Sequence, residues 1–298
     1  MKKSAFLLIL LAGILWGTSG IFAHYMYPYG FTPLELVFCR ASMSFLLMAG
    51  YALLRDRSLF RVRLKELPLL LLVGLGIFGT ASLYYTAMAM TSVSTAVVLM
   101  YTAPVYVLLV SVLFLGERLS RLKLLSIGLM LLGCCLVAGI IGGLRFTLWG
   151  ILAGVASGLT YAIYNLLVKI AVGRGNPPLS VTMYAFLSMA VAAALCVKPQ
   201  SLFAHVTADL PLTLPMAATI GISTCILPYL FYTLAMRDLS AGTASALGVF
   251  EPMAATLFSI LFFGDRPDVY SLVGMVLILL AVVLLGKAED LQNKEVSQ

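Results

Sequence analysis

Charged residues are scarce in this sequence. Only 10% of its 298 residues are Asp, Glu, Lys or Arg, whereas 62% are apolar. A typical soluble domain is about one quarter charged and about one half apolar. This composition excludes a soluble globular protein, and the same shortage of charge excludes a disordered chain. The sequence therefore predicts an all-α protein that crosses a membrane several times.

Histidine and cysteine are also few. The two His and five Cys residues show no metal-ligand spacing, and every Cys lies inside an apolar segment. We therefore expect no metal site and interpret the Cys side chains as small buried apolar groups. The phosphate-binding pattern G-x-x-x-x-G-K-[ST] is absent. We expect no cofactor, no catalytic residues and no direct use of ATP.

Apolar runs of membrane-spanning length fill most of the chain. A bilayer core requires about 20 apolar residues per helix. Lys2 and Lys3 precede the first run, but no small-residue cleavage pattern follows, so we interpret it as a retained helix and not a signal peptide. Ten segments are expected to span the membrane: 5–23, 34–54, 67–90, 94–115, 121–141, 148–171, 178–197, 212–236, 241–263 and 269–286.

Positive residues define an orientation. The net charge is +7, but the Lys and Arg residues occupy short gaps between apolar runs, which favours a lipid bilayer over nucleic acid as the partner. With the N-terminus in the cytoplasm, 15 of the 19 positive residues fall inside, three fall outside, and Arg40 lies within a helix. Both termini are therefore predicted to be cytoplasmic, with an even number of helices.

The two halves of the chain resemble each other. Thr95, Pro104 and Gly116 recur as Thr243, Pro252 and Gly264 at one constant offset. Further echoes are Leu11–Gly13 with Leu152–Gly154, and Tyr85–Thr86 with Tyr232–Thr233. Five helices per half is an odd number, so the two copies must enter the membrane from opposite sides. Such inverted repeats are common in secondary transporters, whose substrate site lies at the repeat interface.

These residues also carry a family resemblance. Leu15-Trp16-Gly17, Arg40, Pro104 and Leu115-Gly116-Glu117-Arg118 in the first half, with Pro252 and Gly264 in the second, resemble the EamA-type transporters of the drug/metabolite transporter superfamily. The second half departs from the pattern, with Asp265 in place of Glu and no counterpart of Arg40. The expected repeats are residues 1–142 and 143–287, followed by a disordered cytoplasmic tail at 288–298.

The first helix of each half presents one patterned face. Gly13, Trp16, Gly17, Gly20 and His24 have the same helical spacing as Gly154, Ser157, Gly158, Tyr161 and Asn165. One interpretation is close helix packing, because small residues let backbones approach each other. The other is the wall of a cavity, in which Trp16, Tyr161 and Asn165 contact the substrate. Both can hold along one face.

Glu251 is the most informative single residue, because it lies near the middle of the ninth predicted helix. An ionised side chain at that depth costs ~2.5–3.5 kcal/mol. Proton coupling is the functional hypothesis, and a neutral, hydrogen-bonded Glu is the structural alternative. Our central prediction is that Glu251 faces a central cavity and is needed for transport.

Arg40, Pro104 and Pro252 are predicted to act in gating. Arg40 has three options: it binds a carboxylate, pairs with Glu35 or extends toward the outer surface, and we favour a structural or gating role. Each proline removes a backbone hydrogen bond and kinks its helix, as a hinge or as a static bend.

The resemblance implies a pocket among helices 1, 3, 4, 6, 8 and 9. Together with Asn165 from the patterned face, the predicted substrate contacts are Trp16, Tyr85, Tyr101, Tyr161, Asn165, Tyr232 and Glu251.

The expected function is secondary transport of small organic metabolites by alternating access, proton-coupled or by exchange. Export of amino acids or related compounds is the activity that the resemblance implies. An intramembrane enzyme is the first alternative, but G-x-S-x-G and H-E-x-x-H are absent. A channel is the second, but no filter pattern is present. The sequence leaves the substrate, the direction, the coupling ion and a monomeric or homodimeric state open.

Overall fold

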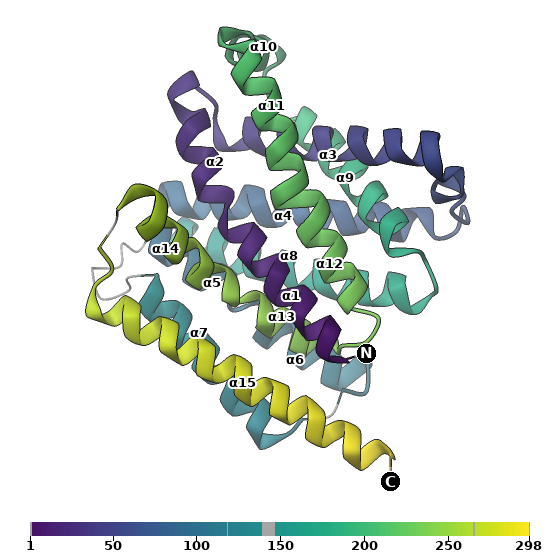
Figure 1. Cartoon of the computed structure of the whole chain (residues 1–298), viewed down its shortest axis with the longest axis vertical. Helices are drawn as coiled ribbons and strands as arrows, with labels where there is room; N and C mark the ends of the chain where they lie inside the picture. Colours follow the sequence, from purple (N-terminus) through teal and green to yellow (C-terminus); the bar gives the residue numbers. More distant parts are fainter. Residues whose placement is uncertain (1, 118, 139–146, 265, 298) are drawn as a thin grey trace.

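The computed structural model describes residues 2–117, 119–138, 147–264 and 266–297, and within them the chain is helical with no strand. Figure 1 shows the arrangement. The elements are α1 (Lys2–Gly17), α2 (Ser19–Met26), η1 (Tyr27–Tyr29), α3 (Pro33–Arg55), η2 (Arg57–Phe60), α4 (Leu67–Met90), α5 (Val93–Met100), α6 (Ala103–Phe114), α7 (Arg121–Val137), α8 (Leu148–Gly173), α9 (Pro178–Ala194), α10 (Pro199–Ala208), α11 (Leu210–Ile220), the π-helix η4 (Gly221–Ile226), α12 (Leu227–Ala235), α13 (Ala241–Gly248), α14 (Phe250–Phe263) and α15 (Val269–Ser297).

The described residues contain eight helical spans that are long and apolar enough to cross a membrane, or nine if the pair α9 and α10, bent by 108°, counts as one span. The polytopic class is therefore confirmed, but the described residues do not confirm the expected ten spans. The shortfall has a simple cause: α7 and α9 contain 17 residues each. That length is at the lower limit for crossing a bilayer core.

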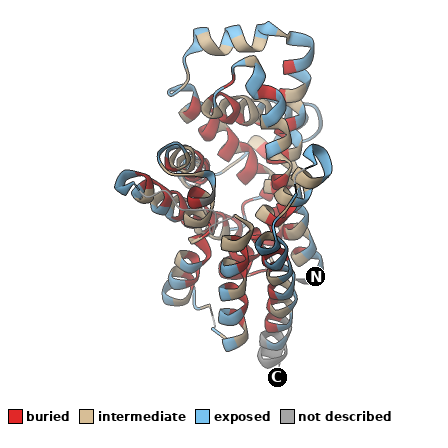
Figure 2. Ribbon diagram, turned by 90° about the vertical axis from the view of Figure 1, so that its left-hand side faces the viewer, coloured by how far each residue is buried: buried red, intermediate tan, exposed pale blue. Residues whose placement is uncertain are grey.

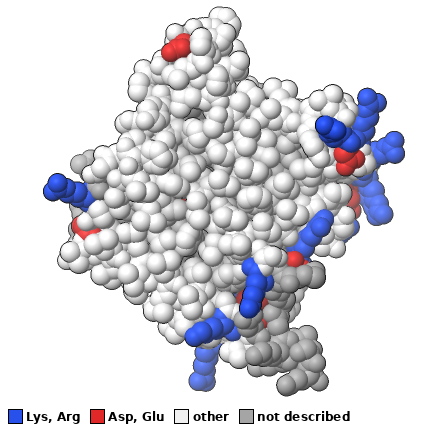
Figure 3. Space-filling view, in the orientation of Figure 1, with Lys and Arg blue, Asp and Glu red and all other residues white. Residues whose placement is uncertain are grey.

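Charge and burial are distributed as a bilayer requires. In Figure 3, Lys and Arg side chains gather along the right and lower edges, the side on which Figure 1 places both termini, and a broad uncharged band separates them from the opposite edge. Figure 2 shows buried residues between the helices and exposed residues on their outer faces. Many exposed side chains are large and apolar, such as Leu54 and Leu113. Lipid tails, and not water, suit such a surface.

The packing of the two halves is reciprocal. Helix α1 packs against α12 and α14, which belong to the other half, and α8 packs against α4, α5 and α6 in the same way. The remaining large contacts join α7 to α15, and α9 to both α3 and α4 (Figure 1). Each half therefore places its first helix against the other half, and the two halves share one core.

Glycine residues allow these close approaches. A Cβ atom at Gly17 would lie 2.8 Å from the backbone nitrogen of Ala255, and one at Gly158 would lie 2.8 Å from the carbonyl oxygen of Leu99. Helices α7 and α15 cross where Gly133 faces Gly274. A Cβ atom at either glycine would lie within 2.7 Å of the carbonyl oxygen of the other. Side chains at these positions would force the helices apart.

Two of the spans are interrupted next to a proline. Helix α5 ends at Met100 and α6 begins at Ala103, directly before Pro104. Helix α13 ends at Gly248 and α14 begins at Phe250, two residues before Pro252. A proline removes one backbone hydrogen bond and disfavours helical geometry in the residue before it. Each proline thus accounts for a break, and each break lies near the middle of its span, Thr95–Phe114 or Ala241–Phe263.

The C-terminal helix differs from the sequence-based expectation. We expected residues 288–298 to form a disordered tail, whereas α15 continues through Ser297. The residues involved include Ala288, Glu289, Leu291, Gln292 and Lys294, which are good helix formers. They extend an apolar helix that is already formed.

Candidate functional site

A central cavity of about 380 Å³ lies between the two halves. Its walls come from α1, α2, α3, α4, α5, η4, α8, α12 and α14, so residues from both repeats meet there. The charged and aromatic residues that line it, together with one proline, are Trp16, Arg40, Tyr84, Tyr85, Tyr101, Tyr161, Tyr164, Tyr229, Glu251 and Pro252. The volume is within the usual range for a small-molecule site.

The two helix breaks meet at this cavity. Glu251 lies in the first turn of α14, and Tyr101 lies in the break between α5 and α6. The phenol of Tyr101 donates a hydrogen bond of 2.7 Å to Oε2 of Glu251. A helix N-terminus favours a carboxylate, because its backbone N–H groups carry partial positive charge. The structure thus supplies Glu251 with one hydrogen-bond donor and a favourable dipole from opposite halves of the chain.

Aromatic rings form much of the remaining wall. Trp16 and Tyr229 meet edge to face, with ring centroids 5.1 Å apart. Tyr161 and Tyr164 are stacked at 5.9 Å, and Tyr164 contacts Tyr229 at 5.7 Å. Packed rings of this kind are held by their neighbours, so they present a rigid apolar surface. Such a surface suits the hydrocarbon or ring portion of an organic molecule.

Two predicted contacts lie behind this wall. Asn165 and Tyr232 are fully buried and do not line the cavity among the described residues. The phenol of Tyr232 donates to Oδ1 of Asn165, and Nδ2 of Asn165 donates to the carbonyl oxygen of Tyr161 at 2.6 Å. This pair fixes the helical turn that carries Tyr161. Trp16, Tyr85, Tyr101, Tyr161 and Glu251 are the predicted contacts that the structure brings together around the cavity.

Arg40 also lines the cavity, whereas Pro104 is buried beside it without lining it. The alternative that Arg40 pairs with Glu35 is not observed. The carboxylate of Glu35 accepts hydrogen bonds from the backbone of Thr32 at 2.7 Å and from Ser201 at 2.9 Å, and it lies 3.2 Å from Nδ1 of His205. No described carboxylate lies within ion-pair distance of Arg40.

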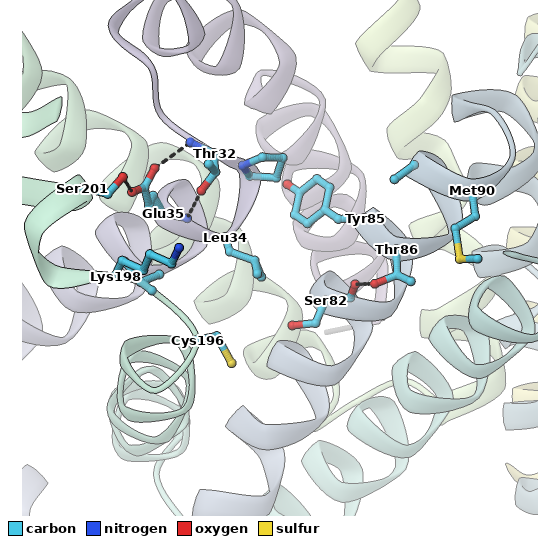
Figure 4. A pocket seen from close by; sticks show the side chains of 13 residues that line it. Thr32, Leu34, Glu35, Ser82, Tyr85, Thr86, Met90, Cys196, Lys198 and Ser201 are labelled. Carbon is cyan, nitrogen blue, oxygen red and sulfur yellow. Dashed lines mark hydrogen bonds between the residues drawn. The ribbon is translucent and has the colours of Figure 1, made fainter. Parts of the chain in front are cut away.

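A second hollow, of about 620 Å³, lies beside the central cavity (Figure 4). It is formed by the start of α3, the last turns of α4 and the turn between α9 and α10. Tyr85 lines both spaces. Figure 4 shows Glu35 held by Thr32 and Ser201 at one side of the hollow, with Ser82 and Thr86 at the other. The hollow therefore adjoins the central cavity at the end of α4 that lies far from the positively charged edge.

A cluster of buried charged residues lies at the opposite end of the helix bundle, the end that holds both termini. The ammonium group of Lys123 pairs with Glu117, lies 3.6 Å from Glu289 and donates to Ser240 at 3.1 Å. The side chains of Lys123, Glu117 and Glu289 are 1%, 7% and 10% exposed. The side chain of Glu117 therefore lies inside the protein, where it joins the loop after α6 to α7, α13 and α15.

The predicted contacts leave out several residues of the cavity wall. Tyr164 and Tyr229 lie one helical turn from Tyr161 and Tyr232, and the sequence groups all four as inner tyrosines suited to stack on an organic substrate. Thr80 and Thr224 gave no such signal, because threonine is common in membrane helices and neither residue lies in a repeated motif.

Comparisons with known proteins agree with this arrangement. The EamA-like transporter family profile matches residues 3–139 and 148–287. A protein of Archaeoglobus fulgidus, named "Uncharacterized transporter", is 30% identical over 290 residues, which cover 93% of this chain and 94% of the relative. "Uncharacterized transporter YxxF" of Bacillus subtilis is 27% identical, covering 95% and 89%. A crystal structure with 20% identity superposes with a TM-score of 0.77, covers 95% of this chain and 96% of its own, and shows the fold.

The chain belongs to the EamA-like transporter family, within the drug/metabolite transporter superfamily. The predicted resemblance is thereby confirmed. It is a multi-pass membrane protein of a transporter family, and the central cavity is its candidate substrate site.

Proposed function

We propose that this protein is a secondary transporter that moves small organic metabolites by alternating access, with the central cavity as its substrate site. The observation that carries the proposal is the meeting of Glu251 and Tyr101, from two interrupted helices of opposite halves, at one cavity. Interrupted helices from repeated halves, meeting near the middle of the membrane, are the usual construction of a secondary transporter site.

The same proposal includes ten spans arranged as two inverted repeats. Helices α7 and α9 supply the two additional spans, because 17 residues approach the thickness of a bilayer core. The reciprocal packing of the halves and the two matched segments, 3–139 and 148–287, support the repeat. Both termini lie on the side where positive charge gathers, which favours a cytoplasmic location for them.

Glu251 couples transport to protons in this proposal. Its carboxylate has one described hydrogen-bond donor, Tyr101, and it borders the space that a substrate would enter. A substrate or a proton can therefore neutralise the carboxylate, and the two compete. Transport by exchange of two substrates is the alternative outcome of the test below.

Amino acids and related compounds are the first candidates, in the direction of export, because the family resemblance implies them. Trp16, Tyr85, Tyr101 and Tyr161 would contact the substrate directly, and Asn165 and Tyr232 would hold Tyr161 in place. The breaks beside Pro104 and Pro252 would bend between the two states.

The test uses purified protein and Glu251→Gln, which preserves the size of the side chain and removes its charge. A metabolite panel is screened by thermal shift at several pH values, because a ligand that binds only the folded state raises Tm. Active compounds then enter a counterflow assay in proteoliposomes. We expect saturable counterflow with wild type, and pH-dependent binding that becomes independent of pH in Glu251→Gln.

Asp238→Asn is the matched control, since Asp238 is an acid that does not line the cavity among the described residues. It should retain the wild-type pH response. Equal stabilisation of wild type and Glu251→Gln at every pH would make Glu251 structural. Failure of every compound to show saturable counterflow would contradict transport itself.

A further inference from the structure

The central cavity is unusually rich in hydrogen-bond donors that lack a partner. Within the described chain, six side chains have a buried polar atom without any hydrogen bond, and three of them line this one cavity. The three atoms are Nε1 of Trp16, Nε of Arg40 and Oη of Tyr164. A buried donor without an acceptor is costly, so a cluster of three indicates a site that a ligand completes.

The chemistry of these atoms limits what the ligand can be. An indole N–H and a guanidinium N–H can only donate, and a tyrosine hydroxyl can donate as well. An ammonium group would satisfy neither Trp16 nor Arg40, because it has no acceptor. An oxyanion has the acceptor atoms that each of the three donors lacks.

Charge leads to the same conclusion. A guanidinium stays protonated in proteins, and no described carboxylate lies within ion-pair distance of Arg40. Glu251 lines the same cavity and interacts with Arg40 from beyond ion-pair distance, but its hydrogen bond comes from Tyr101, and Glu35 is held by Thr32 and Ser201. A positive charge left unpaired at this depth is unfavourable unless a counter-ion arrives.

We infer that Arg40, with Trp16 and Tyr164, forms an anion-binding subsite, and that the transported substrate carries a carboxylate. This assigns Arg40 to substrate recognition in place of the gating role predicted from the sequence. A planar carboxylate matches the fork of an Arg side chain better than a spherical anion does. The inference rests on the proposed function, because it assigns the substrate class for the same cavity.

The shape of the cavity places the rest of the substrate. The donors lie among the packed rings of Trp16, Tyr164 and Tyr229, so the group bearing the carboxylate is compact and apolar. Glu251 lines the same cavity, and its carboxylate would accept hydrogen bonds from an ammonium group of a substrate that has one. The carboxylate is therefore required, and the amine adds affinity.

The experiment measures thermal shifts of the full chain with three probes that share one phenyl ring. They are 3-phenylpropionate, which has only a carboxylate, 2-phenylethylamine, which has only an amine, and phenylalanine, which has both. We expect the two carboxylate probes to raise the Tm of wild type. The shift should disappear in Arg40→Gln, and Trp16→Phe and Tyr164→Phe should each weaken apparent affinity roughly tenfold, since each removes one bond to a charged group.

The two aromatic variants retain a ring and remove one donor, so they carry the test if Arg40→Gln does not fold. Tyr184→Phe is their control, because the Tyr184 hydroxyl donates to the carbonyl oxygen of Phe60 at 3.1 Å, and Tyr184 does not line the cavity among the described residues. It should bind carboxylates as wild type does.

The possible failures are distinguishable. If 2-phenylethylamine stabilises wild type and loses its effect in Glu251→Gln, while neither carboxylate probe binds, the anion subsite is wrong and the transport site stands. Carboxylate binding that survives unchanged in Arg40→Gln, Trp16→Phe and Tyr164→Phe also overturns the inference. If no probe binds and no metabolite shows counterflow, the proposed function itself fails.

Discussion

The two ends of the helix bundle come from equivalent segments of the repeat but have different chemistry. At the end that holds the termini, Ser240 caps α13 and also contacts Glu117 and Lys123. At the other end its counterpart, Ser92, caps α5 and contacts Thr95. The position equivalent to Lys123 is Ser271. One end therefore contains a buried ion cluster, whereas at the other end a serine occupies the position equivalent to its lysine.

This difference correlates with the position of the cavity. The cavity residues of α4 begin at its middle, with Ile77, and continue along the half that runs away from the positively charged edge. Val93 at the start of α5 also lines the space. The Lys123 cluster and the bonds from Lys169 to the carbonyl oxygens of Met236 and Leu239, 2.7 and 2.6 Å, lie toward the other end. The two ends are thus held by different bonds: a buried ion cluster at one, and the contacts of Glu35 with Thr32, Ser201 and His205 at the other.

The largest predicted effect comes from breaking the ion cluster. Lys123→Met would leave the buried carboxylates of Glu117 and Glu289 facing each other without their cation. Removing one partner of a buried ion pair costs about 3–5 kcal/mol, so we expect a marked loss of thermal stability in detergent.

Ser271→Ala, at the equivalent position of the other end, is the control for Lys123→Met. The backbone and the hydroxyl of Ser271 both bond the exposed carboxylate of Asp268, and the substitution retains the backbone bond. The change in stability should be within about 0.5 kcal/mol. Equal Tm values for the two variants would show that the ends do not differ in the way described.

A smaller effect is predicted at the core, where the halves should behave alike. Gly17→Ala would place a Cβ 2.8–3.0 Å from Ala254 and Ala255, and Gly158→Ala would place one 2.8–3.1 Å from the backbone of Leu99 and Met100. Overpacking of this kind typically costs about 1–3 kcal/mol. Thermal unfolding should show a similar decrease in Tm for both variants. The chemical difference between the two halves would then be limited to the ends of the bundle.

Gly20→Ala is the control for both core variants, because a Cβ at Gly20 has no neighbour within 4 Å. Alanine in that helix should be neutral or stabilising by roughly 0.5–1 kcal/mol. A loss at Gly17 without one at Gly158 would contradict the reciprocal packing.

The sequence predicted the membrane class, the family and the repeated motifs, because each of these depends on composition or on spacing along the chain. It did not predict the Tyr101–Glu251 bond. The two residues are 150 positions apart, and no local pattern indicates which tyrosine would reach the acid. Depth in the membrane suggested a role for Glu251 but not its partner.

Lys123 shows a second limit of sequence reasoning. A lysine at the start of a membrane helix is read as a topology signal, and on that rule it belongs at the aqueous surface. In the structure its side chain is 1% exposed, because Glu117 of the loop before α7 and Glu289 of α15 surround it. The number of carboxylates near a lysine depends on tertiary packing, and a single sequence does not encode it locally.

The two capping serines extend the comparison between the ends. Ser92→Ala removes one N-cap bond, to the backbone of Thr95 at 3.1 Å, which is worth about 1 kcal/mol. Ser240→Ala removes the matching cap to Thr243 and, in addition, the 2.8 Å bond to Glu117 and the 3.1 Å bond from Lys123. Measured by thermal unfolding, Ser240→Ala should cost more than Ser92→Ala by roughly 1–3 kcal/mol, because hydrogen bonds to charged groups are the stronger ones. If both variants lower the free energy of unfolding by the same amount, Ser240 acts only as a helix cap. The cluster of Lys123, Glu117 and Glu289 is then not stabilised by its contact with α13.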